Sequence, residues 1–284
     1  MKGERIMNVA VIGAGTMGSG IGQVFAQYDG CEKVYLCDIK QEFADGGKAK
    51  IVKNLEKQVS KGKMDQAKAD AIAAKIIPGL KDICGDADLI VEAAIENLQI
   101  KQQTFKDLAA ICKPDTIFAT NTSSLSITAI GYGLDRPVIG MHFFNPAPVM
   151  KLVEVNVGFG TPQEIVDKIV DLSKAIGKTP VLVQEGPGFI VNRLMIPEIN
   201  EAIMIYEQGL ASVEDIDVAM ELGGNHPMGP LKLGDLIGLD IVLAIMEVLQ
   251  AETGDCKYRP AMYLKKMVRA GKLGRKTGEG FYKY

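Results

Sequence analysis

A glycine-rich motif near the start of the chain constrains the fold more than any other feature of the sequence. The motif GAGTMG occupies residues 13–18 and directly follows an apolar run at 9–12 that is typical of a buried strand. In a strand–turn–helix unit, Gly13 would form the tight turn and Gly15 would let the backbone approach a pyrophosphate. Gly18 would allow the helix to pack closely on the strand. The motif therefore predicts a dinucleotide-binding βαβ unit.

The acidic residue Asp38 makes this prediction more specific than a glycine turn alone. Asp38 ends a second apolar run at 34–37 and lies 20 residues after Gly18, the spacing expected of the carboxylate that binds the ribose. A carboxylate there accepts a hydrogen bond from the 2′-hydroxyl of NAD and repels the 2′-phosphate of NADP. We expect NAD as the cofactor, and the nearby Lys40 keeps NADP open as an alternative.

The order of sequence patterns predicts two domains. Apolar, β-branched runs alternate with helical patterns in the first part of the chain, which is typical of a parallel sheet; the runs are 6–12, 34–37, 89–93, 116–120, 138–142 and 181–183. Only helical patterns follow, at 192–208, 213–222, 239–252 and 260–270. We predict an α/β fold with a Rossmann-type, mostly parallel sheet at 1–186 and an all-helical domain at 187–284. The breaker cluster at 186–188 marks the boundary.

Composition excludes several classes of protein. The net charge of −3 argues against general nucleic-acid binding, which needs a basic surface. Five cysteines and two histidines without metal-ligand spacing predict reduced thiols and no metal site. No apolar stretch approaches the length of about 18 residues that a membrane span needs. We expect a soluble cytoplasmic protein that binds neither nucleic acid nor a membrane.

Four lysines form a basic face on a predicted amphipathic helix. Lys50, Lys53, Lys57 and Lys61 fall on one side of this helix, opposite apolar residues that include Leu55. Such a stripe is often a solvated surface. A phosphate-rich ligand is the alternative, because it would relieve the repulsion between the lysines.

A polar segment, TNTSS at residues 120–124, directly follows the predicted strand at 116–119. The carboxyl ends of parallel strands are where open α/β sheets bind their ligands. A serine before the apolar residues that follow would also cap a helix well. We therefore expect one of Ser123 and Ser124 to cap a helix and the other to contact a ligand.

His142 and Glu154 are candidates for acid–base chemistry. A single histidine in an apolar strand is often only a core residue. If the runs at 138–142 and 151–155 form neighbouring strands, however, the Glu154 carboxylate would lie against the imidazole ring. It would then fix the tautomer of the ring and stabilise its protonated form, as a proton-shuttling dehydrogenase requires. The second histidine, His226, lies in a segment rich in Gly and Pro and is interpreted as structural.

Together, these features resemble the L-3-hydroxyacyl-CoA dehydrogenase family, and within it the bacterial members that act on 3-hydroxybutyryl-CoA. The supporting motifs occur in one order along nearly the whole chain: GAGTMG with Asp38, NTSSL at 121–125, HFFNP at 142–146, KLVEV at 151–155, PGFIVNR at 187–193 and GEGFY at 278–282. The resemblance implies interconversion of (S)-3-hydroxybutyryl-CoA and acetoacetyl-CoA in fatty-acid or butyrate metabolism. It also implies a homodimer formed through the helical domain.

The resemblance further implies roles for individual residues. His142 would be the general acid/base with Glu154 as its charge partner, while Ser123 and Asn192 would bond the reacting part of the substrate. Lys57 and Lys61 would contact CoA. The segment 131–136 is shorter than in the family, which leaves open whether Ser123 or Ser124 makes the substrate contact. The implied cofactor contacts are Gly13, Gly15, Thr16, Met17, Gly18, Asp38, Glu96, Lys101, Asn145 and Lys276.

Two other functions remain open. The β-hydroxyacid and 6-phosphogluconate dehydrogenases share the sheet and the glycine motif. Those families, however, look to use a lysine on the linking helix for proton transfer, and this chain has Asn192 and Arg193 at the start of that helix. A non-catalytic dinucleotide-binding protein would keep the fold without turnover. The presence of His142, Glu154, Ser123 and Asn192 argues against this second alternative.

Overall fold

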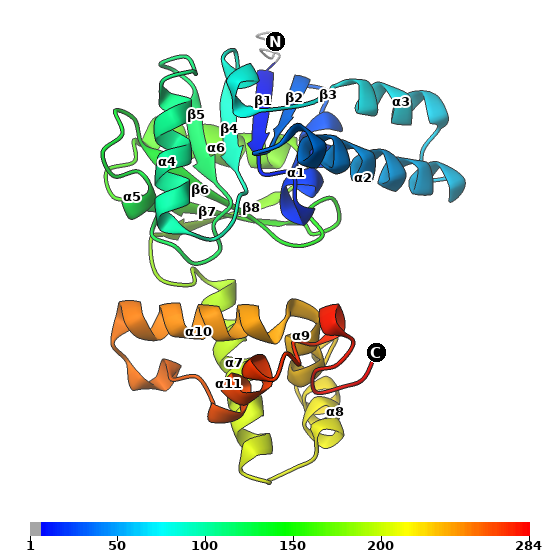
Figure 1. Cartoon of the computed structure of the whole chain (residues 1–284), viewed down its shortest axis with the longest axis vertical. Coiled ribbons are helices and arrows are strands. Elements are labelled where there is room, and N and C mark those ends of the chain that lie inside the picture. The colour runs from blue at the N-terminus through cyan, green and yellow to red at the C-terminus, as the bar shows by residue number, and fades with distance from the viewer. Residues whose placement is uncertain (1–6) are drawn as a thin grey trace. The chain divides into compact units, whose positions relative to one another are not determined.

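The computed structural model describes residues 7–284, which form two compact units (Figure 1). The first unit extends to Glu185, and the second comprises Gly186–Tyr284. A sheet flanked by helices makes up the first unit, and helices dominate the second. No helix in the described part of the chain is both long and apolar enough to cross a membrane.

The first unit contains an eight-stranded sheet in the order β3-β2-β1-β4-β5-β6-β7-β8. Its strands are β1 (Met7–Ile12), β2 (Cys31–Cys37), β3 (Ile76–Gly79), β4 (Leu89–Glu92), β5 (Ile117–Thr120), β6 (Val138–Phe143), β7 (Leu152–Val157) and β8 (Thr179–Gln184). All neighbours are parallel except β6 and β7. The mostly parallel sheet confirms the predicted fold class. The strand β3 was not predicted from the sequence. It is a short edge strand that tolerates Pro78 because one of its sides lacks a strand partner.

Helices cover both faces of this sheet. They are α1 (Thr16–Ala26), α2 (Gln41–Ser60), α3 (Gln66–Ala74), α4 (Leu98–Ala109), α5 (Ile127–Ile130) and α6 (Gln163–Ala175), with a 3₁₀ turn, η1 (Lys81–Cys84). Alternate strand residues such as Val9 and Val155 pack in one apolar cluster with α1, α2 and α6. On α4, Phe105 contacts Phe118 of β5, with ring centroids 5.2 Å apart. His142, which alternates with Met141 and Phe143 of the first cluster, therefore points to the opposite face from α1 and α6.

The second unit is built from α7 (Val191–Glu207), α8 (Val213–Gly223), α9 (Pro230–Ile237), α10 (Leu239–Thr253) and α11 (Met262–Arg269), with the 3₁₀ turns η2 (Cys256–Tyr258) and η3 (Arg275–Thr277). Four of these helices match the predicted ones, and α9 was missed because the segment 224–230, which is rich in Gly and Pro and leads into it, indicated a loop. Proline is favoured in the first turn of a helix, where its missing N–H costs nothing. The buried Asp217 accepts hydrogen bonds from the Leu231 and Lys232 N–H groups and so caps α9.

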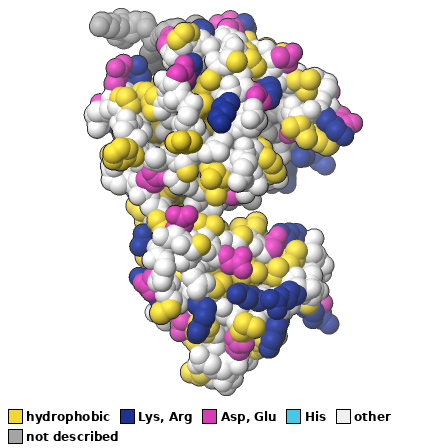
Figure 2. Space-filling model, turned by 60° about the vertical axis from the view of Figure 1, so that its left-hand side comes forward, with side chains coloured by type: hydrophobic (Ala, Val, Ile, Leu, Met, Phe, Trp, Pro, Cys, Tyr) yellow, Lys and Arg dark blue, Asp and Glu magenta, His cyan; other side chains and the backbone are white. Residues whose placement is uncertain are grey.

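The surface of the molecule is mixed in charge. Figure 2 shows acidic and basic side chains interspersed over the face in view, with Lys and Arg side chains gathered on part of the second unit. Large apolar side chains are also exposed on that unit, among them Leu194, Leu210 and Leu222.

Candidate active site

The glycine motif forms the turn between β1 and α1, as predicted. Gly13 has a φ of +100°, and a Cβ there would lie 2.6 Å from the Ala93 carbonyl oxygen. A Cβ on Gly18 would lie 1.6 Å from the Gly13 carbonyl oxygen, whereas one on Gly15 would meet no heavy atom within 4 Å. Two of the glycines are therefore required by packing. The third leaves the turn open to the close approach of a ligand at the N-terminus of α1.

Asp38 lies at the end of β2 and contacts this turn directly. Its carboxylate accepts a hydrogen bond from the Ala14 N–H at 2.7 Å and from the Ile39 N–H at 2.7 Å. The Lys40 ammonium instead lies 3.6 Å from the Glu42 carboxylate and over the Phe43 ring. A carboxylate, and not a lysine, thus stands beside the open turn. This arrangement fits NAD better than NADP.

His142 and Glu154 form a buried pair. They are direct partners across the antiparallel β6–β7 ladder, so their side chains project from the same face of the sheet. The His142 Nδ1 atom lies 2.7 Å from Glu154 Oε2, with side-chain exposures of 7% and 0%. The Phe144 ring covers the imidazole, with ring centroids 4.5 Å apart. The structure therefore confirms the expected contact between the histidine and the carboxylate.

Glu96 organises the polar segment that follows β5. One of its carboxylate oxygens accepts hydrogen bonds from the backbone N–H and the hydroxyl of both Ser123 and Ser124, at 2.8–3.2 Å. The Thr122 hydroxyl donates to the same oxygen at 2.6 Å. The expectation that Ser123 or Ser124 caps a helix is wrong: Ser126 caps α5 by accepting from the Ala129 N–H. The two serines are held by the carboxylate instead.

A buried ion pair lies next to Glu96. The Lys101 ammonium contacts both carboxylate oxygens of Glu92 at 2.8 and 2.9 Å and lies 3.3 Å from Glu96. The Thr120 hydroxyl and the Ala94 N–H also donate to Glu92. Burial by itself would raise the pKa of the Glu96 carboxyl, but the Lys101 charge and the hydrogen-bond donors lower it below its usual value. Glu96 is therefore held as a carboxylate.

The predicted contact of Lys101 with the cofactor stays a prediction, and the structure shows only the protein partners of this side chain. Its side chain is 1% exposed, and its ammonium is already surrounded by Glu92, Glu96 and the Ala94 carbonyl oxygen. Glu92 is not among the site residues predicted from the sequence. A signal was present, because this glutamate ends an otherwise apolar run, and a carboxylate buried there needs a cationic partner.

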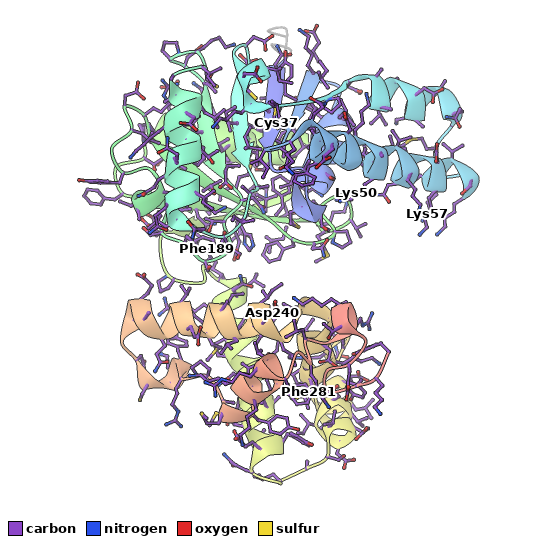
Figure 3. All side chains as sticks on the ribbon, in the orientation of Figure 1. Cys37, Lys50, Lys57, Phe189, Asp240 and Phe281 are labelled. Atoms are coloured by element: carbon purple, nitrogen blue, oxygen red, sulfur yellow. The ribbon has the colours of Figure 1, made fainter. Side chains whose placement is uncertain are left out.

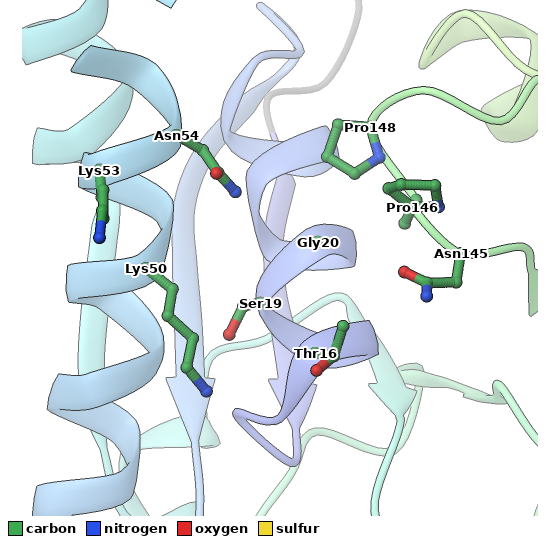
Figure 4. Close-up of a pocket in the computed structure, with 10 residues that line it drawn as sticks. Thr16, Ser19, Gly20, Lys50, Lys53, Asn54, Asn145, Pro146 and Pro148 are labelled. Carbon is green, nitrogen blue, oxygen red and sulfur yellow. The ribbon is translucent and has the colours of Figure 1, made fainter. Parts of the chain in front are cut away.

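A pocket of about 250 Å³ lies between α1, α2 and the loop that joins β6 to β7 (Figure 4). Lys50 and Asn54 extend from α2 toward α1, and Asn145 faces them from the loop. The residues that line the pocket are Thr16, Ser19, Gly20, Lys50, Lys53, Asn54, Asn145, Pro146, Ala147 and Pro148. The pocket thus adjoins the glycine turn and carries two positive charges.

The basic face of α2 is only partly as predicted. Lys50, Lys53 and Lys57 are exposed on the helix, and Figure 3 labels two of them. Lys61 lies just beyond the last helical residue, Ser60, so it belongs to the turn after the helix. Of the four lysines, Lys50 and Lys53 line the pocket, whereas Lys57 and Lys61 lie farther along the chain.

Two predicted site residues belong to the second unit. Asn192 lies in the first turn of α7 and is 7% exposed. Lys276 lies in η3, where its ammonium pairs with the Asp240 carboxylate at 2.5 Å. Their predicted contacts with substrate and cofactor stay predictions.

Comparison with known proteins agrees with this geometry. Residues 8–186 match the family model of the 3-hydroxyacyl-CoA dehydrogenase NAD-binding domain, and residues 188–284 match the model of the C-terminal domain of the same family. The chain belongs to the 3-hydroxyacyl-CoA dehydrogenase family. This confirms the resemblance drawn from the sequence motifs and leaves the β-hydroxyacid alternative without support.

Individual members of the 3-hydroxyacyl-CoA dehydrogenase family match the chain over almost its full length. A 3-hydroxybutyryl-CoA dehydrogenase of Clostridioides difficile is 55% identical, with 98% of this chain and 99% of that protein covered. The mitochondrial hydroxyacyl-coenzyme A dehydrogenase of Homo sapiens is 43% identical, with coverages of 98% and 91%. The crystal structure of (S)-3-hydroxybutyryl-CoA dehydrogenase from Ralstonia eutropha superimposes with a TM-score of 0.93 at 45% identity, covering 98% and 99%.

Proposed function

We propose that this 3-hydroxyacyl-CoA dehydrogenase interconverts (S)-3-hydroxybutyryl-CoA and acetoacetyl-CoA with NAD(H). The buried His142–Glu154 pair carries the proposal, because a hydride transfer at C3 must be coupled to a proton transfer at its oxygen. The near-full-length similarity to 3-hydroxybutyryl-CoA dehydrogenases supports this choice of substrate. The first unit would bind the dinucleotide, and the second would contribute to substrate binding and to dimer formation.

Residues of the first unit would hold the cofactor. The open turn at Gly15 and the N-terminus of α1 would receive the pyrophosphate, and Asp38 would bond the ribose. When bound, NAD supplies the acceptor for the hydride that leaves C3, and NADH supplies the donor for the reverse reaction. Every other step falls to side chains of the protein.

His142 would act as the general acid/base. Because Glu154 contacts Nδ1, the carboxylate holds the proton on that nitrogen, and Nε2 exchanges a proton with the substrate oxygen. In the oxidative direction His142 takes the hydroxyl proton, and Glu154 stabilises the resulting imidazolium. In the reductive direction the imidazolium donates that proton to the developing alkoxide.

Ser123 would orient the substrate oxygen. Ser124 is only 6% exposed, whereas Ser123 is half-buried, and we therefore assign the substrate contact to Ser123. Glu96 holds this loop through its bonds to both serines. Asn192 is assigned the same task as Ser123 on the basis of the family motif.

The basic face of α2 would bind the phosphates of CoA, which lie far from the reacting carbon. We expect Lys57→Ala/Lys61→Ala to raise KM for acetoacetyl-CoA several-fold, since exposed lysine–phosphate contacts are individually weak. The increase should shrink at high salt. It should also be smaller for the corresponding pantetheine thioester, which lacks those phosphates. Steady-state kinetics with both thioesters at two salt concentrations measure this.

Two further double variants make this test specific. Lys63→Ala/Lys68→Ala removes the same charge from exposed positions after α2 and on α3, and we expect it to leave KM unchanged. Lys50→Ala/Lys53→Ala removes the charge from the pocket. If only this last variant raises KM for acetoacetyl-CoA, the phosphates bind in the pocket and the assignment to Lys57 and Lys61 is wrong.

Asp38 should control the choice of cofactor. We expect Asp38→Ala to weaken the binding of NADH and to reduce the discrimination against NADPH, because the carboxylate that repels the 2′-phosphate is removed. Dissociation constants for both cofactors, measured by fluorescence, test this directly. Tighter binding of NADPH than of NADH by the unmodified protein would contradict the assignment.

The assay for the proposed function is the oxidation of NADH in the presence of acetoacetyl-CoA. We expect turnover that is faster with NADH than with NADPH. Binding of NADH without turnover of any 3-oxoacyl-CoA would favour the non-catalytic alternative.

A cytoplasmic location and dimer formation through the second unit belong to the same proposal. The exposed Leu194, Leu210 and Leu222 support a dimer, and the mass of the protein in solution tests it.

A further inference from the structure

Lys178 is a buried lysine that binds a loop of the active site. It lies between α6 and β8 and is 8% exposed. Its ammonium donates hydrogen bonds to the carbonyl oxygens of Ala147 at 2.5 Å and Met150 at 2.8 Å. Both carbonyls belong to the loop 144–151, which connects β6 to β7. A single side chain thus ties two points of this loop to another part of the unit.

The ammonium is held there without a paired carboxylate. Within residues 7–284, the partners of the Lys178 ammonium are carbonyl oxygens and not an acidic side chain, and burial together with the nearby Lys151 charge lowers its pKa. Burying a cation is unfavourable unless hydrogen bonds compensate for the lost water. The two carbonyls provide that compensation. The lysine and the observed loop conformation therefore depend on each other.

The loop 144–151 forms one wall of the pocket. Asn145, Pro146, Ala147 and Pro148 all line it, and a Cβ on Gly20 of α1 would lie 3.1 Å from the Ala147 Cβ. The Thr179 N–H, next to Lys178, also donates to the Lys151 carbonyl at 2.7 Å. Lys178 thus binds the carbonyl of Ala147, a residue that packs closely on the dinucleotide-binding helix, and a second carbonyl three residues farther along the same loop.

We propose that Lys178 is a positioning residue for cofactor binding: its ammonium holds the loop 144–151 in the conformation that presents Asn145 beside the glycine turn. The inference rests on the proposed function, because Asn145 is a cofactor contact only within it. Lys178 itself is not among the residues that line the pocket, and it binds the backbone of the loop. It acts by keeping most molecules in the conformation that is competent to bind.

The decisive variant is Lys178→Met, which keeps the length of the side chain and removes its charge and donors. If about one-tenth of molecules retain the competent loop, the apparent Kd for NADH rises about tenfold, because ligand binding must then also order the loop. Saturating NADH restores that conformation, so kcat at saturation should stay within about twofold of the unmodified value. General structural damage would have the opposite effect on these two quantities. It would lower Tm and kcat and leave the KM of the folded fraction unchanged.

Two matched variants complete the experiment. Lys178→Arg keeps a charged donor and should recover part of the NADH affinity, and it also serves if the methionine variant does not fold. Lys75→Met removes a similar bond, from an ammonium to the Tyr28 carbonyl at 2.9 Å, in a region that contributes no residue to the pocket. We expect it to leave the Kd for NADH unchanged.

The outcomes separate this inference from the proposed function. A Kd for NADH in Lys178→Met equal to that of the unmodified protein would overturn the inference, even if the unmodified protein turns over acetoacetyl-CoA. An equal loss of affinity in Lys75→Met would overturn it as well. Failure of the unmodified protein to oxidise NADH with acetoacetyl-CoA would instead contradict the proposed function, whereas the Kd measurement still reports on the loop.

Discussion

Replacing His142 by glutamine is expected to lower kcat for acetoacetyl-CoA reduction by about 10²–10⁴-fold, the usual contribution of general acid–base catalysis. Glutamine keeps much of the size and polarity of the imidazole but cannot donate a proton to the developing alkoxide. The Kd for NADH should change little, because the glycine turn and Asp38 are untouched. Stopped-flow and steady-state rates, together with NADH fluorescence titration, measure both quantities.

Glu154→Gln provides the comparison for this variant. It leaves His142 in place but removes the charge that stabilises the imidazolium at a distance of 2.7 Å. We expect a loss of kcat that is smaller than that of His142→Gln, and a double variant no worse than His142→Gln alone, since the two side chains act as a unit. Near-normal turnover in His142→Gln would remove this residue from the mechanism.

Replacing Lys101 by methionine is expected to lower the free energy of unfolding by about 3–5 kcal/mol, because it leaves the Glu92 charge buried without its partner. Glu92 is fully buried, and the Thr120 hydroxyl and the Ala94 N–H would be its remaining donors. Denaturant unfolding of the unmodified protein, of Lys101→Met and of the double variant Glu92→Gln/Lys101→Met measures the effect. The double variant should recover part of the lost stability, since it removes the buried Glu92 charge together with that of its partner.

The matched control for Lys101 is Lys168→Met, which breaks an exposed helical pair with Glu164. Solvent screens such a pair, so we expect a much smaller loss of stability than for Lys101→Met. The Lys101 variant should also alter the position of Ser123, because the Lys101 ammonium lies beside Glu96 and Glu96 holds both serines. Equal stability losses in the two lysine variants would contradict the assignment of Lys101 to a buried supporting network.

The sequence predicted best those features that are encoded over short distances. The glycine motif and Asp38 belong to one βαβ unit, whose geometry is nearly fixed by the turn that joins strand and helix. The His142–Glu154 contact needed one further assumption, that the two runs are neighbouring strands. The antiparallel β6–β7 register makes the two residues direct partners. Both predictions required few contacts between distant parts of the chain.

Features that depend on long-range packing could not be predicted in this way. The ion pair of Lys101 with Glu92 joins a helix to the end of a strand, and helical periodicity alone does not reveal that a lysine turns inward. The same holds for Lys178, whose partners are carbonyls of a loop 28 and 31 residues away. The serine capping prediction failed for a related reason. Glu96, distant in sequence, accepts hydrogen bonds from the hydroxyls of both serines, and the capping bond from the Ala129 N–H goes to Ser126 instead.

The most direct test of the mechanism is the fate of the transferred hydride. The unmodified protein would be supplied with acetoacetyl-CoA and with NADH that carries deuterium at the transferred position, and the product would be analysed by mass spectrometry and chiral chromatography. We predict (S)-3-hydroxybutyryl-CoA with one deuterium at C3. A product without deuterium at C3, or the R enantiomer, would contradict the account.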